Sequence, residues 1–239
     1  PFFITICAAS DSGGMEVKMK LKKHAVISGV IFCETGLRIG GSKDDIEIGG
    51  MDNPIIRHPV TGLPYIPGSS LKGRMRSLLE LKHSARTQQT GQPCGCGNCI
   101  VCKIFGTHKA RESNLGPTRI IVRDAFLTSK SQDELKAANQ EKGIYYSEVK
   151  YENLVDRKTG KAEHPRPNER VPADTEFNFE IVLRIFEGDN EKEIMDFVKE
   201  GLALVQKEYL GGSGSRGYGK VRFINTTADG APFIIEEGK

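Results

Sequence analysis

The spacing of apolar and polar residues divides the chain into predicted strands and helices. Segments with alternating apolar residues, or rich in β-branched and aromatic ones, predict strands over 16–33 (a single strand or a hairpin), 119–127, 144–155, 175–186 and 220–225. Apolar side chains at helical spacing predict two helices, over 67–82 and 191–209. We expect Ser69 or Ser70 to cap the first helix and Gly211 to end the second.

Three stretches between these elements lack the pattern of a core element. Residues 36–54 are rich in glycine and predict a long exposed loop. Residues 83–117 form a polar insertion rich in cysteine and glycine, and residues 156–174 are charged and predict an excursion from the core. The order of the elements favours an α+β fold with helices on one face of a sheet, and a split β-α-β, ferredoxin-like core is the first choice.

The composition is typical of a soluble globular protein. The 239 residues are 38% hydrophobic and 27% charged, which is enough to bury a sizeable core. No apolar run approaches the roughly 20 residues of a membrane-spanning helix, so no membrane partner is expected. Residues 1–14, which precede Met15, are interpreted as a cloning or upstream remnant, and residues 15–239 as a single domain.

Four cysteines lie close together with the spacing of metal ligands: Cys94, Cys96, Cys99 and Cys102. Four thiolates suit tetrahedral zinc, and a metal would give the polar insertion a reason to fold. If all four bind, no position remains for water, so we expect structural rather than catalytic zinc. An iron–sulfur cluster, a site in which His83 replaces one cysteine, and four reduced thiols without metal are the alternatives. This clustering does not look like a disulfide framework, which favours the cytoplasm.

Basic residues gather locally although the net charge is only +3. Lys72, Arg74 and Arg76 follow the serines at the start of the first predicted helix, where an anion is favoured. A second basic segment, 103–123, ends at Arg123. The set predicts a groove that follows phosphates, whereas any one residue alone would be read as part of a solvated face.

The glycine-rich loop 211–220 is a second candidate phosphate site. Glycine lets backbone N–H groups approach phosphates, Arg216 suits a phosphate or a base, and Tyr218 offers an aromatic face beside Lys220. A flexible turn is the plainer interpretation. The match of 214–220 to a P-loop is rejected, because Val221 replaces the required Ser or Thr and the loop runs from a helix into a strand.

Acidic residues decorate the first glycine-rich loop: Asp44, Asp45, Glu47 and Asp52. Asp52 precedes Asn53 and Pro54, so the backbone near it is restricted. A carboxylate there suits binding of Mg²⁺ or removal of a proton from a ribose 2′-OH. The alternative is an ordinary turn-forming aspartate.

Several blocks together resemble the RAMP superfamily of CRISPR proteins, and most closely the backbone subunit of type III-A (Csm) effector complexes. They are G-L-R-I-G-G-S (36–42), G-G-M-D-N-P (49–54), L-P-Y-I-P-G-S-S-L-K-G-R-M-R (63–76), I-I-V-R-D-A-F (120–126) and Y-L-G-G-S-G-S-R-G-Y-G-K-V (209–221). The likeness spans nearly all of residues 16–225. It implies an RRM-like palm, a helical lid inserted at about 68–118 and a thumb hairpin at about 155–175.

The resemblance also implies function. Copies would stack into a helical filament along CRISPR RNA with other Csm-complex subunits, and the thumb would flip out nucleotides of the guide–target duplex. The resemblance implies cleavage of target RNA that depends on Mg²⁺ or Mn²⁺, and the aspartate that promotes this cleavage in the family corresponds to Asp52. Many relatives have His where this chain has Arg38, which we expect to keep the contact with the guide. Patches and resemblance together predict these RNA-binding residues: Arg38, Ser69, Ser70, Lys72, Arg74, Arg76, Arg123, Arg216, Tyr218 and Lys220.

Three other functions compete with target cleavage. The main rival is an RNA-binding scaffold that performs no chemistry. An endonuclease that processes precursor RNA is disfavoured, because no histidine lies between Pro165 and Lys239. A zinc enzyme would need an open metal position. The absence of the cysteine cluster from some relatives fits a structural role better than a catalytic one.

Overall fold

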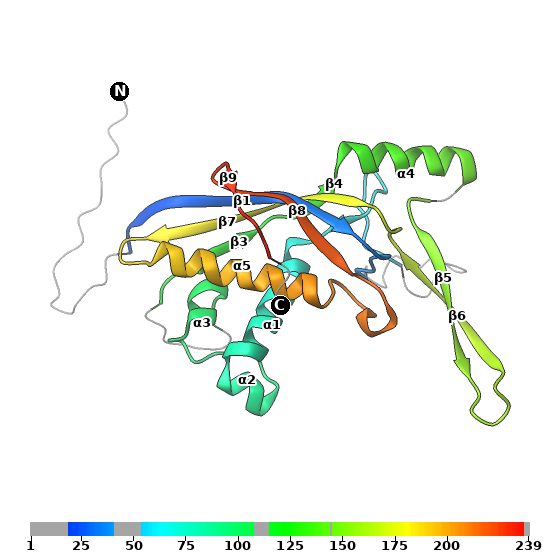
Figure 1. Cartoon of the computed structure of the whole chain (residues 1–239), viewed down its shortest axis with the longest axis horizontal. Coiled ribbons are helices and arrows are strands. Elements are labelled where there is room, and N and C mark those ends of the chain that lie inside the picture. Colours follow the sequence, from blue (N-terminus) through cyan, green and yellow to red (C-terminus); the bar gives the residue numbers. More distant parts are fainter. Residues whose placement is uncertain (1–18, 41–53, 108–114, 144, 237–239) are drawn as a thin grey trace.

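The computed structural model describes residues 19–40, 54–107, 115–143 and 145–236. Its centre is an antiparallel sheet in the order β2-β4-β7-β1-β8-β9, with β3 also paired to β7 (Figure 1). The strands are β1 (Leu21–Cys33), β2 (Tyr65–Ile66), β3 (Ile120–Val122), β4 (Ala125–Leu127), β7 (Glu176–Phe186), β8 (Val221–Ala228) and β9 (Ala231–Pro232). The expected mixture of helices and a sheet is confirmed, and the strand pairs of this sheet are antiparallel.

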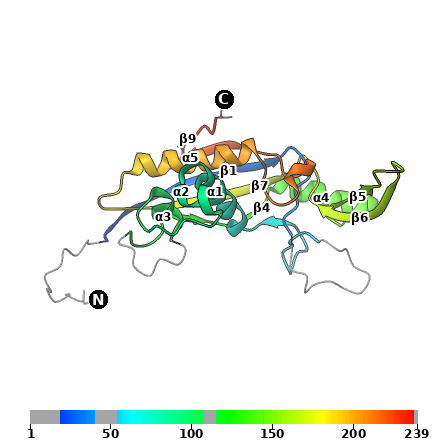
Figure 2. The same cartoon turned by 90° about the horizontal axis from the view of Figure 1, so that it is seen from below.

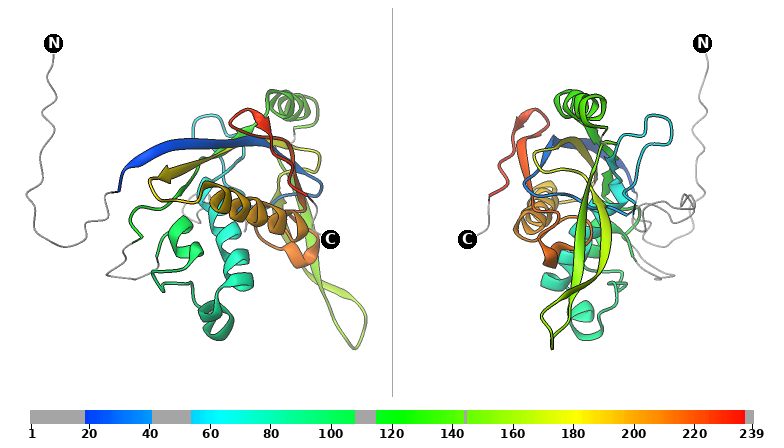
Figure 3. Two further views of the ribbon diagram at one scale, coloured as in Figure 1. Left: turned by 60° about the vertical axis from the view of Figure 1, so that its left-hand side comes forward. Right: turned by 90° about the vertical axis from the view of Figure 1, so that its right-hand side faces the viewer.

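Two helices cover one face of this sheet, α1 (Gly68–His83) and α5 (Glu191–Lys207) (Figures 1 and 3). Alternate residues of β7 are buried beneath them, while Asn178 and Glu180 between those residues are exposed. The predicted apolar stripe of α1 is buried, and α5 approaches it closely at Gly201, where a Cβ would lie 2.9 Å from Leu79 and 3.2 Å from Met75. Apolar spacing thus placed both helices correctly.

The start of α1 differs from the prediction. The helix begins at Gly68, after Pro67, and neither Ser69 nor Ser70 caps it with a side chain. Instead, the Gly68 N–H donates to Asp124 Oδ1 at 2.7 Å, at the break between β3 and β4. A Cβ at position 68 would overlap the carbonyl of Val122, so a serine cannot take this place. The predicted serine caps were therefore wrong, and the capping carboxylate comes instead from the segment between β3 and β4.

The end of α5 also differs. The helix ends at Lys207, and Glu208 occupies the capping position that was expected at Gly211. Gly211 has φ of 80°, and a Cβ there would overlap the carbonyl oxygen of Arg38. A glycine is therefore required at position 211 because two loops approach each other closely there, and not because the helix ends there.

The insertion carries two short helices, α2 (Ala85–Thr90) and α3 (Ile100–Phe105), which lie below the sheet in Figure 1. Although the segment is polar overall, α3 buries Val101, Ile104 and Phe105 in the main core. Lys103 on the same helix pairs with Asp189 at 2.9 Å. The insertion is thereby held against the body of the protein.

A long hairpin projects from the sheet (Figures 1 and 2) and consists of β5 (Glu148–Val155) and β6 (Ala162–Arg170). The predicted excursion over 156–174 is thus mostly the hairpin's turn and second strand, and the hairpin begins before the expected residue 155. The helix α4 (Ser129–Lys142) was not predicted. No helix in the described parts of the chain has the length and apolar character needed to cross a membrane.

Candidate nucleic-acid interface and metal centre

The loop between α5 and β8, residues 211–219, is fixed by the segment that follows β1. The Gly212 N–H donates to the Arg38 carbonyl at 2.8 Å, and the Gly219 N–H donates to the Gly36 carbonyl at 3.0 Å. Arg38 Nη1 also donates to Ser213 Oγ at 3.3 Å. Two motifs far apart in the sequence are therefore brought together, with Arg38 beside the glycine loop.

The base of the hairpin, by which we mean the part that carries Lys150, Glu152 and Arg170, covers the other side of this loop. Arg216 Nη1 lies 2.6 Å from Glu152 Oε2, and Lys150 Nζ donates to the Arg216 carbonyl at 3.4 Å. Burial alone would raise the pKa of Glu152, but contacts with Tyr218 and Arg216 outweigh this effect and lower it. The Arg216 side chain is nevertheless 65% exposed, so it stays open to a ligand. The exposed Lys220 lies just beyond the loop.

Tyr218 does not offer the exposed aromatic face that was expected. It is 1% exposed, and its ring lies beneath Lys150 Nζ at 4.6 Å and the Arg170 guanidinium at 4.9 Å. The hairpin base, which sequence reasoning did not connect to this loop, covers the ring. Tyr218 therefore supports two cations here instead of presenting a free platform for a base.

The basic residues of α1 have different surroundings. Arg74 donates to the Tyr209 carbonyl at 3.0 Å and pairs with Glu208 at 2.6 Å, while Arg76 pairs with Glu80 at 2.8 Å. Both guanidinium groups are thus already bound within the chain. Ser69 is exposed and Ser70 half-buried in the first turn.

Lys72 is the least neutralised of the α1 cations. Among the described residues, no carboxylate forms an ion pair with Lys72. Burial, together with the nearby Arg76 and Arg184, lowers its pKa. Like charges without a matching anion favour a phosphate at this point. Arg184, on β7, adds to the positive charge around Lys72, and the sequence analysis did not single it out.

Arg123 lies apart from these residues, on the face of the sheet opposite α1 and α5. Its Nε is 3.7 Å from Glu180 Oε1, and both side chains are about half exposed or more. Together with Phe126 and Asn178 it lines a hollow on the open face. The structure therefore does not place Arg123 with the glycine loop.

Asp52 lies outside the described residues, as do Asp44, Asp45 and Glu47. The two ends of their loop are described, and they are joined by a bridge between Gly40 and Ile55. The Ile55 N–H donates to Glu169 Oε2 at 2.8 Å at the base of β6, and Arg57 pairs with the same carboxylate. The ends of this loop are thus fastened to the hairpin, a connection that no sequence pattern indicated.

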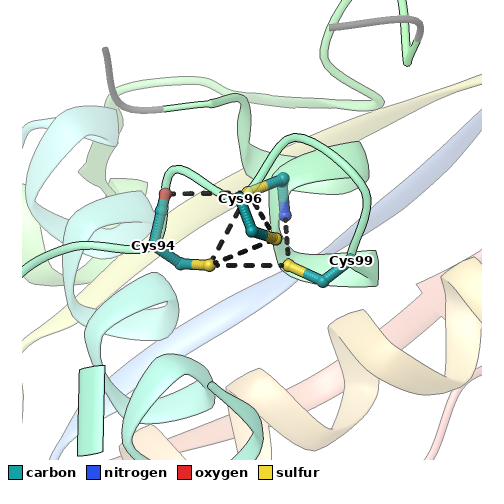
Figure 4. A group of neighbouring side chains, drawn as sticks. Cys94, Cys96 and Cys99 are labelled. Carbon is teal, nitrogen blue, oxygen red and sulfur yellow. Dashed lines mark hydrogen bonds between the residues drawn. The ribbon is translucent and has the colours of Figure 1, made fainter. Parts of the chain in front are cut away.

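The four predicted cysteines converge on one point (Figure 4). The Sγ of Cys94 lies 3.6 Å from that of Cys96, 3.7 Å from that of Cys99 and 3.8 Å from that of Cys102. Thiolates at about 2.3 Å from a tetrahedral zinc ion would be about 3.8 Å apart, so the group fits zinc. His83 instead contacts Glu200 at 2.9 Å, so the cluster comprises four cysteines.

Comparison with known proteins agrees with this architecture. The family model of the RAMP superfamily matches residues 31–222. The chain is 50% identical over 218 residues to the CRISPR system Cms endoribonuclease Csm3 of Methanothermobacter thermautotrophicus, covering 87% of this chain and 86% of the relative.

Two solved structures are also similar. One is the Csm3–Csm4 subcomplex in the type III-A CRISPR-Cas interference complex, with 33% identity, a TM-score of 0.56 and coverage of 88% of this chain and 80% of the other. The second is Methanopyrus kandleri Csm3, with 26% identity, a TM-score of 0.54 and coverage of 84% and 75%. The chain belongs to the RAMP superfamily and, within it, to the Csm3 family.

Proposed function

We propose that this chain is the repeated, RNA-binding subunit of a type III-A CRISPR effector complex that cleaves target RNA at regular intervals. The observation that carries the proposal is the meeting of Arg38, Arg216 and the hairpin base around one glycine loop. The ends of the loop that contains Asp52 are fastened to that same hairpin. Relatives named as endoribonucleases, up to 50% identical, support the assignment.

We assign the parts of the fold accordingly. The order β8-β1-β7-β4, with crossovers through α1 and α5, supports a ferredoxin-like, RRM-like palm. The insertion over about 68–118 is the lid, stapled by zinc on the four cysteines, and the hairpin β5–β6 is the thumb. We assign residues 15–239 to one domain of this kind.

The proposed mechanism is one of positioning. Arg38, Lys72 and Arg216 hold the guide by its phosphates, and base pairing selects the target. The thumb displaces one target nucleotide, which lets its 2′-oxygen line up with the neighbouring phosphorus. The 2′-oxygen attacks and the bond from phosphorus to the 5′-oxygen breaks. The leaving 5′-oxygen takes a proton from water, so that a cyclic phosphate and a 5′-hydroxyl result.

Asp52 is the residue we assign to this step. Its carboxylate accepts the 2′-OH proton or holds the divalent ion. Mg²⁺ or Mn²⁺ would neutralise the charge that develops on the phosphate. Copies of the chain would assemble as a filament along CRISPR RNA, with other Csm subunits, in the cytoplasm.

The test uses the assembled complex with guide and complementary RNA. We expect a regularly spaced cleavage ladder that disappears with EDTA and with Asp52→Ala, while target binding persists. Asp45→Ala, a change in the same loop, serves as the control and should leave the ladder intact. A complex that binds target but never cuts it would favour the scaffold function. A ladder that survives Asp52→Ala would refute the catalytic assignment.

A further inference from the structure

Glu80 is a buried carboxylate near the C-terminal end of α1, on the side of the helix that contacts the insertion. It is 4% exposed, a position that is unfavourable for a charge unless it is paired and hydrogen-bonded. Its Oε1 accepts from Arg76 Nε at 2.8 Å, one helical turn earlier, and from the backbone N–H of Cys94 at 3.0 Å. The carboxylate thus connects α1 to the first cysteine of the metal site.

Arg76 completes the contact from the other side. Its Nη2 donates to the carbonyl oxygen of Cys94 at 2.9 Å, so one ion pair binds both backbone groups of that cysteine. The Cys94 side chain is buried, and its Sγ lies within 3.8 Å of the three other sulfur atoms (Figure 4). The position of this thiol is therefore set by α1.

The same contacts limit what else Arg76 can do. Its side chain is 21% exposed and its guanidinium is shared between Glu80 and Cys94. Lys72, one turn earlier on α1, has no paired carboxylate among the described residues. The two cations therefore differ in role although the sequence presents them as one basic face.

We propose that the Arg76–Glu80 pair positions Cys94 for metal binding, and that Arg76 affects RNA binding only through this site. Groups that orient a metal ligand from outside its coordination sphere tune the affinity for the metal. The proposal rests on the assignment of zinc to the four cysteines. By linkage, loss of zinc loosens the peptide that holds this part of α1, and loss of the pair weakens zinc.

The first experiment measures zinc affinity of the full chain by competition with a chromophoric chelator. Glu80→Ala should weaken zinc by about 10–100-fold, whereas Glu80→Gln retains an acceptor oxygen and should restore most of the affinity. Glu200→Gln is the matched control, because Glu200 pairs with Lys82 and His83 at the end of the same helix. Wild-type zinc affinity in a folded Glu80→Ala chain would overturn the proposal.

Amide exchange of the wild-type chain covers the case in which Glu80→Ala does not fold. Removing zinc should reduce the protection of the Cys94 amide, because its hydrogen bond to Glu80 and zinc binding are linked. Equal protection with and without zinc would contradict the proposal. If the wild-type chain binds no zinc at all, the metal assignment itself fails, which is a different result from zinc binding that ignores Glu80.

The salt dependence of guide-RNA binding separates the two roles of cations. Lys72→Gln should reduce the slope of affinity against salt by about 1, as expected for loss of a phosphate contact. Arg76→Gln should leave the slope unchanged while zinc affinity falls. A reduced slope with zinc fully retained would make Arg76 an RNA contact and refute the inference.

Discussion

Arg216 Nη1 and Glu152 Oε2 lie 2.6 Å apart, so an ion pair joins the glycine loop to the hairpin. Glu152 is 17% exposed and Arg216 65% exposed, which leaves the cation accessible while its partner is largely covered. A phosphate that approaches Arg216 must therefore compete with Glu152. If the loop binds RNA as proposed, the hairpin carboxylate weakens that attraction.

Replacing Glu152 with glutamine should strengthen binding of guide RNA. Ion pairs at the protein surface contribute about 0.2–1 kcal/mol, so we expect a gain of up to about fivefold at low salt, and none at high salt. Filter binding across a salt series measures it. Glu163→Gln, which removes a charge from the exposed part of β6, is the control for net charge. Equal gains from both variants would contradict a specific competition at Arg216.

Two glycines of the same loop should differ in their tolerance of alanine. Gly217 and Gly219 have φ of 82° and 72°, but a Cβ meets nothing within 4 Å at 217 and overlaps the Leu210 carbonyl at 219. Gly217→Ala should cost about 1–2 kcal/mol, which lowers the melting temperature by roughly 2–8 °C. Gly219→Ala should lower it at least twice as far and weaken RNA binding. Similar melting temperatures would show that the close approach does not matter.

The sequence predicted those elements whose cause is local. The apolar spacing was sufficient to predict α1 and α5, because it reports directly on which face packs against the core. The cysteine spacing was sufficient to predict the cluster, because it reports directly on ligation. The helix α4 was missed because it buries little apolar surface and so lacks an apolar stripe. Its clearest buried apolar side chain is Leu135. The sequence nevertheless contained signals that could have indicated α4, namely Thr128 at its N-cap and Gly143 at its C-cap. The cap of α1 could not be predicted in this way, because it depends on Asp124 from the distant segment between β3 and β4.

The candidate RNA site was predicted as a set of cations together with two serines and Tyr218. Sequence cannot decide which of them remain free, because that depends on carboxylates that fold against them. Arg74 meets Glu208 and Arg76 meets Glu80, whereas Lys72 meets two other cations. The covering of Tyr218 likewise depends on a hairpin that is more than 40 residues distant in the chain.

Removal of zinc should expose four thiols and no more. The cysteines of the cluster become reactive when the metal is chelated, because a thiolate bound to zinc is protected. Cys33 stays silent, since complete burial raises its pKa to about 12. Titration with an aromatic disulfide before and after chelation counts the difference. Denaturation is the control that reveals Cys33, and a gain other than four thiols on chelation would contradict the tetracysteine site.

Asp189 should make the docking of the insertion dependent on pH. Its side chain is 3% exposed and is bound by Arg119 Nε and Lys103 Nζ, each at 2.9 Å. Burial raises its pKa, but the hydrogen bonds from Arg119 and Lys103 outweigh this and lower the pKa to about 2 from 3.8. Because the folded value lies below the unfolded one, this stabilisation is complete above about pH 4 and is lost as the pH falls through about 2.

Asp189→Asn should therefore destabilise the chain at neutral pH by roughly 2 kcal/mol, since each unit of pKa corresponds to about 1.4 kcal/mol. The difference between wild type and variant should shrink between pH 4 and pH 2, where the wild-type carboxylate also becomes neutral. Urea unfolding at several pH values measures both quantities. Glu187→Gln, which breaks an exposed pair with Lys20, is the control and should change stability much less than Asp189→Asn at neutral pH. A difference for Asp189→Asn that stays constant down to pH 2 would show that packing, not charge, holds α3 at this site.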